Sequence, residues 1–154
     1  MIEISKTIRT KASPARVLDF FSKLGEHFVE LWPEAHHEYE ITSEGPMGVG
    51  TTFRTVQTIK GRKMSSRGVV TKVEPGGFAW RQVPLPLTAG GYRYRPLPEG
   101  GTEITQFLQY GPPWPVIGSV MLFLMEMMAL TRRELEKHLD EEMRRFQQAL
   151  EAEQ

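Results

Sequence analysis

The sequence predicts an α+β fold in which a single antiparallel sheet of about seven strands curves around one long C-terminal helix. A strand pattern opens the chain, and a short helical stretch follows it. Residues 38–110 then alternate apolar and polar positions with a period of two, whereas residues 116–150 have the period of a helix. Because one sheet with one long helix to cover it must curl around that helix, we expect the fold to enclose a cavity.

The N-terminal part predicts one strand and two short helices. Isoleucines alternate with polar residues over residues 2–9, which is typical of a half-buried strand. Ser13 can cap a helix that begins at the proline after it, because the serine oxygen accepts from free amides and proline has no N–H to leave unpaired. We expect Gly25 to end this helix and a second short helix to cover residues 26–32.

Six further strands are predicted between residues 38 and 110. Clusters of glycine, proline and charged residues separate them, and each cluster suits a turn. Residues 111–115 include three prolines and mark the exit from the sheet, since proline cannot pair in a central strand. Such spacing favours an antiparallel meander. The expected strands are residues 38–43, 51–59, 64–73, 78–83, 91–95 and 102–110.

The predicted C-terminal helix has two different halves. The first half begins at Val116, ends at Leu130 and has almost no polar side. We expect it either to line the mouth of a pocket or to pack against a second copy of the chain in a homodimer. It falls short of the roughly 20 residues that a membrane-spanning helix needs. The second half has apolar side chains within a sector about 80° wide, and so predicts one buried face, made by Leu135, Leu139, Met143, Phe146 and Leu150.

Composition excludes several classes of function. Nineteen basic and nineteen acidic residues balance, so no global field attracts nucleic acid, and we expect no nucleic-acid partner. The absence of cysteine removes disulfides, thiolate nucleophiles and thiolate metal sites. The length fits a single domain, residues 1–154. The first residues lack the pattern of a signal peptide, so a cytoplasmic location is expected.

Four segments carry a family resemblance. They are Ala-Ser-Pro-Ala-Arg-Val at residues 12–17, Gly-Pro-Met-Gly-Val-Gly-Thr at residues 45–51, Gly-Gly-Thr-Glu-Ile-Thr at residues 100–105, and the closing helix. Together they resemble the START-like SRPBCC superfamily, the helix-grip group that includes polyketide cyclase-like proteins and lipid-transfer domains. The resemblance implies a deep apolar tunnel between the sheet and the last helix. Relatives use such tunnels for lipids, sterols and polyketides, or for ring closure and hydrolysis, so the resemblance identifies an architecture and no substrate.

Aromatic, methionine and glutamine side chains are the candidates for the wall of this tunnel. Aromatic rings make rigid apolar walls, thioethers adapt to irregular ligands, and an inward amide can orient a polar group of the ligand. Alternatively, the apolar residues simply fill the core, or strand parity is misread by one residue and both glutamines face solvent. The candidate ligand-binding residues are Trp32, Tyr39, Phe53, Gln57, Trp80, Tyr92, Tyr94, Gln106, Met121, Met125 and Met128.

Histidine and glutamate side chains make a candidate metal site. His138 and Glu142 are four residues apart and share a helix face, with Glu142 at the edge of the apolar stripe, which predicts a position at the rim of the cavity. One imidazole from the helical corner, His36 or His37, would complete a zinc site with water or a further carboxylate. The opposing interpretation is a polar pair on the helix surface.

Residues 33–36 and 138–143 also resemble the zinc-binding pattern of the diacetylphloroglucinol hydrolase branch of the superfamily. Enzymes of that branch cleave a carbon–carbon bond in an acylated phenol with two histidines and two glutamates. The resemblance implies that His36, His138 and Glu142 are ligands. The fourth ligand is missing, because no glutamate occurs between Glu44 and Glu74.

Two classes of function follow. The leading hypothesis is a carrier or sensor that binds a hydrophobic or aromatic small molecule, with no cofactor and no chemistry of its own, because no complete catalytic set is present. The rival is an enzyme acting on an aromatic polyketide-like substrate. It would be either a zinc-dependent hydrolase or a cofactor-free cyclase in which His36, Tyr92 or Tyr94 moves protons.

Overall fold

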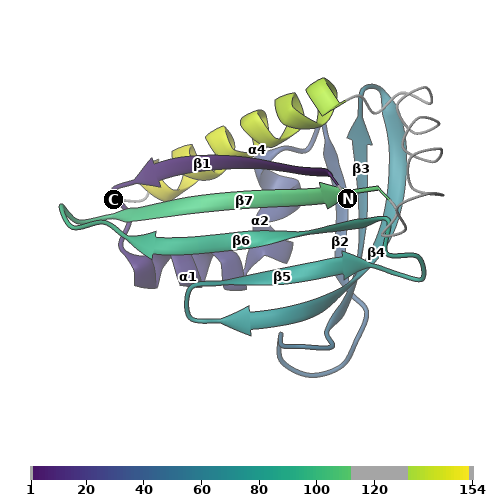
Figure 1. Cartoon of the computed structure of the whole chain (residues 1–154), viewed down its shortest axis with the longest axis horizontal. Helices are drawn as coiled ribbons and strands as arrows, with labels where there is room; N and C mark the ends of the chain where they lie inside the picture. The colour runs from purple at the N-terminus through teal and green to yellow at the C-terminus, as the bar shows by residue number, and fades with distance from the viewer. Residues whose placement is uncertain (1, 112–131, 153–154) are drawn as a thin grey trace.

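A computed structural model describes residues 2–111 and 132–152 of the chain. In that part, one seven-stranded antiparallel sheet curves around three helices (Figure 1). The predicted α+β helix-grip architecture is confirmed. The elements are β1 (Ile2–Thr10), α1 (Pro14–Ser22), α2 (Leu24–Leu31), β2 (His36–Ile41), β3 (Thr52–Ile59), β4 (Arg62–Glu74), β5 (Gly77–Gln82), β6 (Thr88–Pro96), β7 (Thr102–Tyr110) and α4 (Arg132–Ala152).

The sheet is a meander closed by its first strand. Its order is β1-β7-β6-β5-β4-β3-β2, so β2 to β7 pair in sequence and β1 lies beside β7. The β1–β7 register pairs Ile4 with Leu108 and Ile8 with Ile104. Directly opposite residues share a face of a sheet, so these four side chains point to the concave side, where α4 packs.

β6 begins three residues before its predicted start. Gly90 and Gly91 pair with both β5 and β7. A Cβ on Gly91 would overlap the carbonyl oxygen of Phe78, and one on Gly90 would lie 3.1 Å from the indole of Trp80. These glycines allow close approach inside the sheet. The sequence instead predicts Gly90 in the connection before the strand, because glycine is common in turns.

The helical corner begins as predicted and differs from the prediction at Gly25. Ser13 Oγ accepts a hydrogen bond from the Arg16 amide at 3.3 Å, which is the expected cap. Gly25, however, lies inside α2 and does not end α1. A Cβ on Gly25 would lie 2.9 Å from the ring of Tyr39, so the glycine makes room for that ring.

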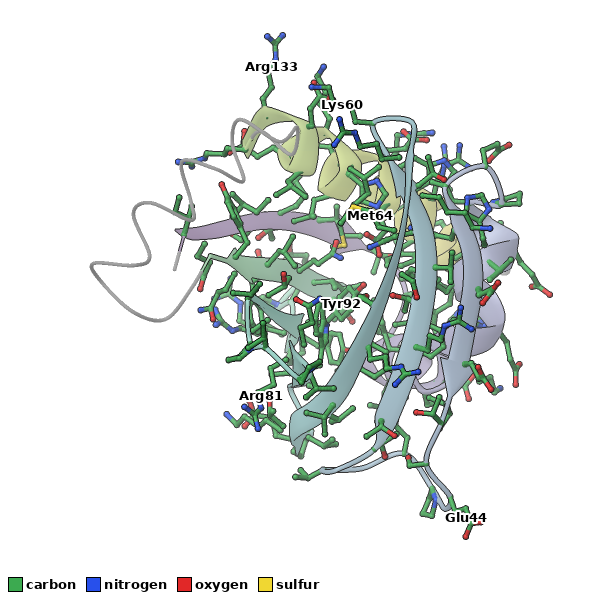
Figure 2. The ribbon with its side chains drawn as sticks, turned by 90° about the vertical axis from the view of Figure 1, so that its right-hand side faces the viewer. Glu44, Lys60, Met64, Arg81, Tyr92 and Arg133 are labelled. Carbon is green, nitrogen blue, oxygen red and sulfur yellow. The ribbon has the colours of Figure 1, made fainter. Side chains whose placement is uncertain are left out.

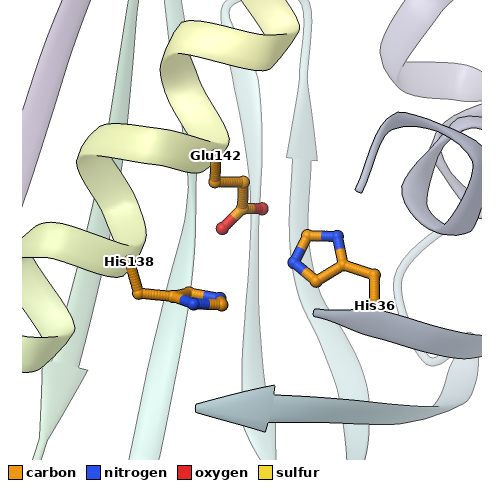
Figure 3. A group of neighbouring side chains, drawn as sticks. All are labelled: His36, His138 and Glu142. Atoms are coloured by element: carbon orange, nitrogen blue, oxygen red, sulfur yellow. The ribbon is translucent and has the colours of Figure 1, made fainter. Parts of the chain in front are cut away.

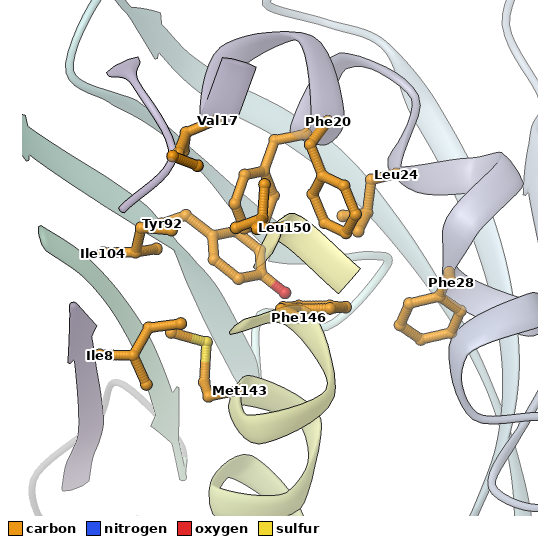
Figure 4. Packing of buried hydrophobic residues seen from close by; sticks show 12 residues of the cluster. Ile8, Val17, Phe20, Leu24, Phe28, Tyr92, Ile104, Met143, Phe146 and Leu150 are labelled. Atoms are coloured by element: carbon orange, nitrogen blue, oxygen red, sulfur yellow. The ribbon is translucent and has the colours of Figure 1, made fainter. Parts of the chain in front are cut away.

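The core lies between the concave face and the helices. Met143, Phe146 and Leu150 of α4 join α1, α2 and Tyr92 of β6 in one cluster (Figure 4). A second cluster joins α4 to β1, β3 and β7. The predicted buried face of the second half of the helix is confirmed, because its five apolar members are at most 7% exposed.

The first half of the predicted helix, with its possible homodimer contact, lies outside the described residues. Within residues 2–111 and 132–152, no helix is long and apolar enough to cross a membrane.

Candidate functional site

Three aromatic side chains form a row on the concave face of the sheet. Tyr39 on β2 stacks on Phe53 of β3 with ring centroids 5.6 Å apart, and Phe53 meets Trp80 of β5 edge to face at 5.8 Å. Glycines on neighbouring strands make room for these rings. A Cβ on Gly68 would overlap the ring of Phe53, and the indole of Trp80 lies close to Gly90. We call Tyr39, Phe53 and Trp80 the aromatic row.

The aromatic row is not sealed inside the core. Its middle ring is buried, whereas Tyr39 and Trp80 are only partly buried. Three side chains from neighbouring strand positions on the same face are also partly exposed, namely Gln57, Met64 and Leu108. The concave face therefore offers apolar surface with one amide beside it, which is the composition of a small-molecule site.

A buried chain of hydrogen bonds crosses from the sheet to α4. The Gln106 amide donates to the Tyr92 hydroxyl at 3.1 Å, and this hydroxyl donates to Glu142 Oε1 at 3.2 Å. Figure 2 shows Tyr92 in the interior, far from the charged side chains of Glu44 and Arg133 at the periphery. The three side chains are at most 9% exposed.

Glu142 lies deeper than the sequence predicts. Its expected position was the rim of the cavity, whereas the carboxylate is 6% exposed. The reason is the curvature of the sheet, which brings Tyr92 of β6 over this face of α4. Burial raises the pKa of Glu142 to about 7, although hydrogen bonds from Gln106 and Tyr92 act in the opposite direction. Burial and the nearby Glu142 also raise the pKa of Tyr92 well above its usual value.

His36, His138 and Glu142 meet between α4 and the start of β2. His138 and Glu142 project from successive turns of α4, and His36 faces them from the start of β2 (Figure 3). One potential ligand atom from each side chain lies within 4.8 Å of the others. The three residues that the hydrolase resemblance singles out are thus neighbours in the structure.

Aromatic rings surround the two imidazoles. Phe28 of α2 stacks on His36 with centroids 3.7 Å apart, and Trp32 stacks on His138 at 4.7 Å. Burial lowers the pKa of both histidines to about 4, so both rings are neutral at pH 7. For His36, the hydrogen bond with the Phe28 carbonyl opposes this shift.

Two predicted ligand-binding aromatics lie away from the aromatic row. Trp32 packs between His138 and Arg145, whose guanidinium carbon is 5.1 Å from the centre of a Trp32 ring. Tyr94 packs on Phe21 of α1, with ring centroids 5.1 Å apart. Both residues lie where helices cover the sheet. The predicted methionines, Met121, Met125 and Met128, lie outside the described residues.

Phe28 is a residue of the site that the sequence did not single out. Its ring lies 5.5 Å from that of Tyr39 and stacks on His36. Ring contacts therefore run without interruption from Trp80 along the aromatic row to the two histidines. In the sequence, Phe28 is one more apolar residue of a short helix, and no local pattern indicates this link.

A hollow of about 730 Å³ lies over β2, β3 and β4. Most of its lining residues are polar or charged and alternate along the strands with the inner side chains, and the others are Phe53, Gly68 and Val83. It differs in place from the predicted apolar tunnel between the sheet and the last helix. Its lining residues are Glu40, Thr42, Thr52, Phe53, Arg54, Ser65, Arg67, Gly68 and Val83.

Comparison with known sequences gives a family match over almost the whole chain. The model of the family described as "Polyketide cyclase / dehydrase and lipid transport" matches residues 1–151. A search of curated proteins gives no match.

Comparison with solved structures gives many matches to the fold. The solution structure of the KanY protein aligns with a TM-score of 0.71 at 17% identity and covers 97% of both chains. The Zhui aromatase/cyclase from Streptomyces sp. R1128 aligns at 0.66 and 15% identity, over 97% of this chain and 90% of that one. Ginseng major latex-like protein 151 from Panax ginseng aligns at 0.62 and 12% identity, over 89% and 96%. At these identities the likeness concerns the fold alone.

Proposed function

Because the chain belongs to the polyketide cyclase / dehydrase and lipid transport family, we propose that it binds a hydrophobic or aromatic small molecule on the concave face of its sheet. The observation that carries this proposal is the aromatic row. Its three rings come from β2, β3 and β5 and contact one another, yet Tyr39 and Trp80 keep part of their surface exposed. A planar ligand would stack on these rings, and an aliphatic one would cover them.

Gln57 is the polar group best placed to orient such a ligand. It lies on β3, four residues from Phe53, and therefore on the same face of the strand. Its side chain is partly exposed, so a ligand carbonyl or hydroxyl can reach the amide. In contrast, Gln106 is buried and its amide already donates to Tyr92. We assign the orienting role to Gln57 alone.

Binding is tested with three probes that represent the chemical classes: naringenin, myristic acid and farnesol. A probe at 100 times its dissociation constant stabilises the native state by about 2.7 kcal/mol, which a thermal shift detects. We expect Trp80→Ala to lower the affinity for the tightest-binding probe about tenfold, because loss of an aromatic contact of about 1.4 kcal/mol corresponds to that factor. Leu18→Ala is the control, since Leu18 lies on α1 and is 50% exposed. Absence of binding for all three probes, or an equal loss in both variants, contradicts the proposal.

A cyclase-type reaction on the bound molecule is the second candidate. The observation that favours it is the contact of the Tyr92 hydroxyl with Glu142, two buried groups that can donate and accept protons in the apolar interior. The test is product analysis by mass spectrometry after incubation with an aromatic poly-β-ketone. If the wild-type protein binds the poly-β-ketone and leaves it unchanged, the cyclase is eliminated and the carrier function remains.

A further inference from the structure

Two buried imidazole nitrogens lack a hydrogen-bond partner among the described residues. They are Nε2 of His36 and Nε2 of His138, and their side chains are 1% and 9% exposed. A buried polar atom without a partner costs free energy, so such atoms are rare in folded proteins and call for an explanation. Each of the two histidines also has a ring nitrogen within 4.8 Å of a carboxylate oxygen of Glu142.

The free nitrogen of His36 is held in an acceptor state. His36 Nδ1 is 2.8 Å from the carbonyl oxygen of Phe28. A carbonyl oxygen only accepts, so the proton of the neutral ring is on Nδ1 and Nε2 carries a lone pair. A histidine that binds a metal ion through one nitrogen usually donates to a carbonyl or carboxylate with the other, and His36 has this arrangement.

Glu142 is also held in position by neighbours. Its Oε1 accepts from Tyr92, and Gln106 fixes the Tyr92 hydroxyl in turn. His138 is one helical turn before Glu142, so both side chains leave the same face of α4. His138 and Glu142 lie on a regular helix, and His36 lies at the start of a strand. Regular secondary structure therefore places the three possible metal ligands, whether or not a small molecule is bound.

We propose that His36 Nε2, His138 Nε2 and the Glu142 carboxylate bind one divalent transition-metal ion, with Zn²⁺ the best match. Two imidazoles and one carboxylate are a typical zinc set, whereas Mg²⁺ and Ca²⁺ prefer oxygen ligands throughout. This proposal does not depend on the hydrophobic ligand, because none of the three donors belongs to the aromatic row.

The spacing of the donors requires only small adjustments. Three atoms within 4.8 Å of one another lie within about 2.8 Å of a common point, so each moves by about 0.7 Å to reach zinc–ligand distances of about 2.1 Å. Side-chain rotation supplies such movements. Because Phe28 and Trp32 stack on the two imidazoles, each ring can shift within its own plane and keep its stacking contact during this adjustment.

Metal binding to the purified, chelator-treated protein tests the proposal directly. The expected result is one equivalent of Zn²⁺ per chain in a competition titration with a chromophoric chelator, together with a rise in the unfolding temperature. Co²⁺ added in its place should give the visible absorption of a four- or five-coordinate site. We expect His138→Ala and Glu142→Gln each to lower the affinity for Zn²⁺ at least 100-fold, because each variant removes one metal ligand.

His37→Ala is the matched control. His37 is adjacent to His36 in the chain, yet its Nε2 lies 2.7 Å from the Thr58 hydroxyl and outside the cluster. We expect this variant to bind one Zn²⁺ with unchanged affinity. A tenfold to 100-fold weakening in Tyr92→Phe, with the stoichiometry kept, would identify Tyr92 as a positioning residue for Glu142.

Two results would overturn the proposal. The first is a folded wild-type protein that takes up less than one equivalent of Zn²⁺ and gives Co²⁺ only the spectrum of the aqueous ion. The second is a His37→Ala variant that loses as much affinity as His138→Ala. Should a variant fail to fold, as judged by circular dichroism, the stoichiometry and Co²⁺ spectrum of the wild type still decide.

Discussion

The hydroxyl of Tyr92 and the carboxylate of Glu142, 50 residues apart in the chain, meet at 3.2 Å inside the core. This contact fixes the rotation of α4 relative to β6, because Glu142 can reach Tyr92 from only one face of its helix. The same rotation turns His138 toward His36. The Tyr92–Glu142 hydrogen bond therefore helps to hold α4 against the sheet and also to set the positions of His138 and Glu142 relative to His36.

Tyr92→Phe should destabilise the metal-free protein by about 1–3 kcal/mol, because it leaves a buried amide and a buried carboxylate without their shared partner. Urea unfolding measures this change in the free energy of unfolding. Tyr94→Phe is the control, since the Tyr94 hydroxyl is buried without a partner among the described residues. A cost for Tyr94→Phe as large as that for Tyr92→Phe would contradict the assigned role of the hydrogen bond.

Phe146→Ala should lower the free energy of unfolding by about 3–5 kcal/mol, because it opens a cavity where α4 meets α1 and β6. Phe146 is 1% exposed and contacts Phe20, Phe21 and Tyr92 through their rings. Leu18→Ala, on the exposed side of α1, should stay within about 0.5 kcal/mol of the wild type. Similar unfolding midpoints for the two variants would show that α4 does not pack as described.

Gly91→Ala should destabilise the sheet by about 2 kcal/mol or more, because the added methyl group would overlap the backbone of β5. Gly48→Ala, in the loop before β3, meets only one atom, at 4.0 Å, and should be nearly neutral. Chemical denaturation of both variants measures the difference. An equal effect would mean that β5 and β6 are not paired in the register found.

Ser13→Ala should cost about 1 kcal/mol through loss of the cap of α1. Ser13→Asp keeps an oxygen acceptor at the same place and should recover most of that stability. Thermal unfolding of the pair checks the assignment. Equal losses in the two variants would argue that the amides of the first turn do not need this side chain.

Much of the fold could be predicted from the sequence, because local patterns determine it. Alternating apolar residues indicated every strand, and the family match over residues 1–151 confirms the superfamily that the motifs suggested. Gly25 and Gly90 are the instructive errors. Gly25 was expected to end a helix and Gly90 to lie before the strand that begins at Gly91, whereas each makes room for a neighbour distant in the chain. No local pattern contains that information.

The sequence predicted which residues belong to the candidate site, but not how they are arranged in space. The spacing of His138 and Glu142 placed them on one helix face, and His36 was named beside them. Their mutual distance depends on how α4 packs against β2, about 100 residues away, and on the curvature of the sheet. The depth of Glu142 and the role of Phe28 depend on the same tertiary contacts, so they emerged only in the structure.

The claim that a small molecule rests on the aromatic row is tested most directly by nuclear magnetic resonance. The measurement is the set of intermolecular NOEs between ¹³C-labelled protein and whichever of naringenin, myristic acid and farnesol binds most tightly. We predict NOEs from the probe to the ring protons of Trp80 and Tyr39. In Trp80→Ala, the NOEs to Tyr39 should require a roughly tenfold higher probe concentration to reach the same intensity. Saturable binding whose NOEs fall only on exposed residues such as Leu18 and Val73 would contradict the claim.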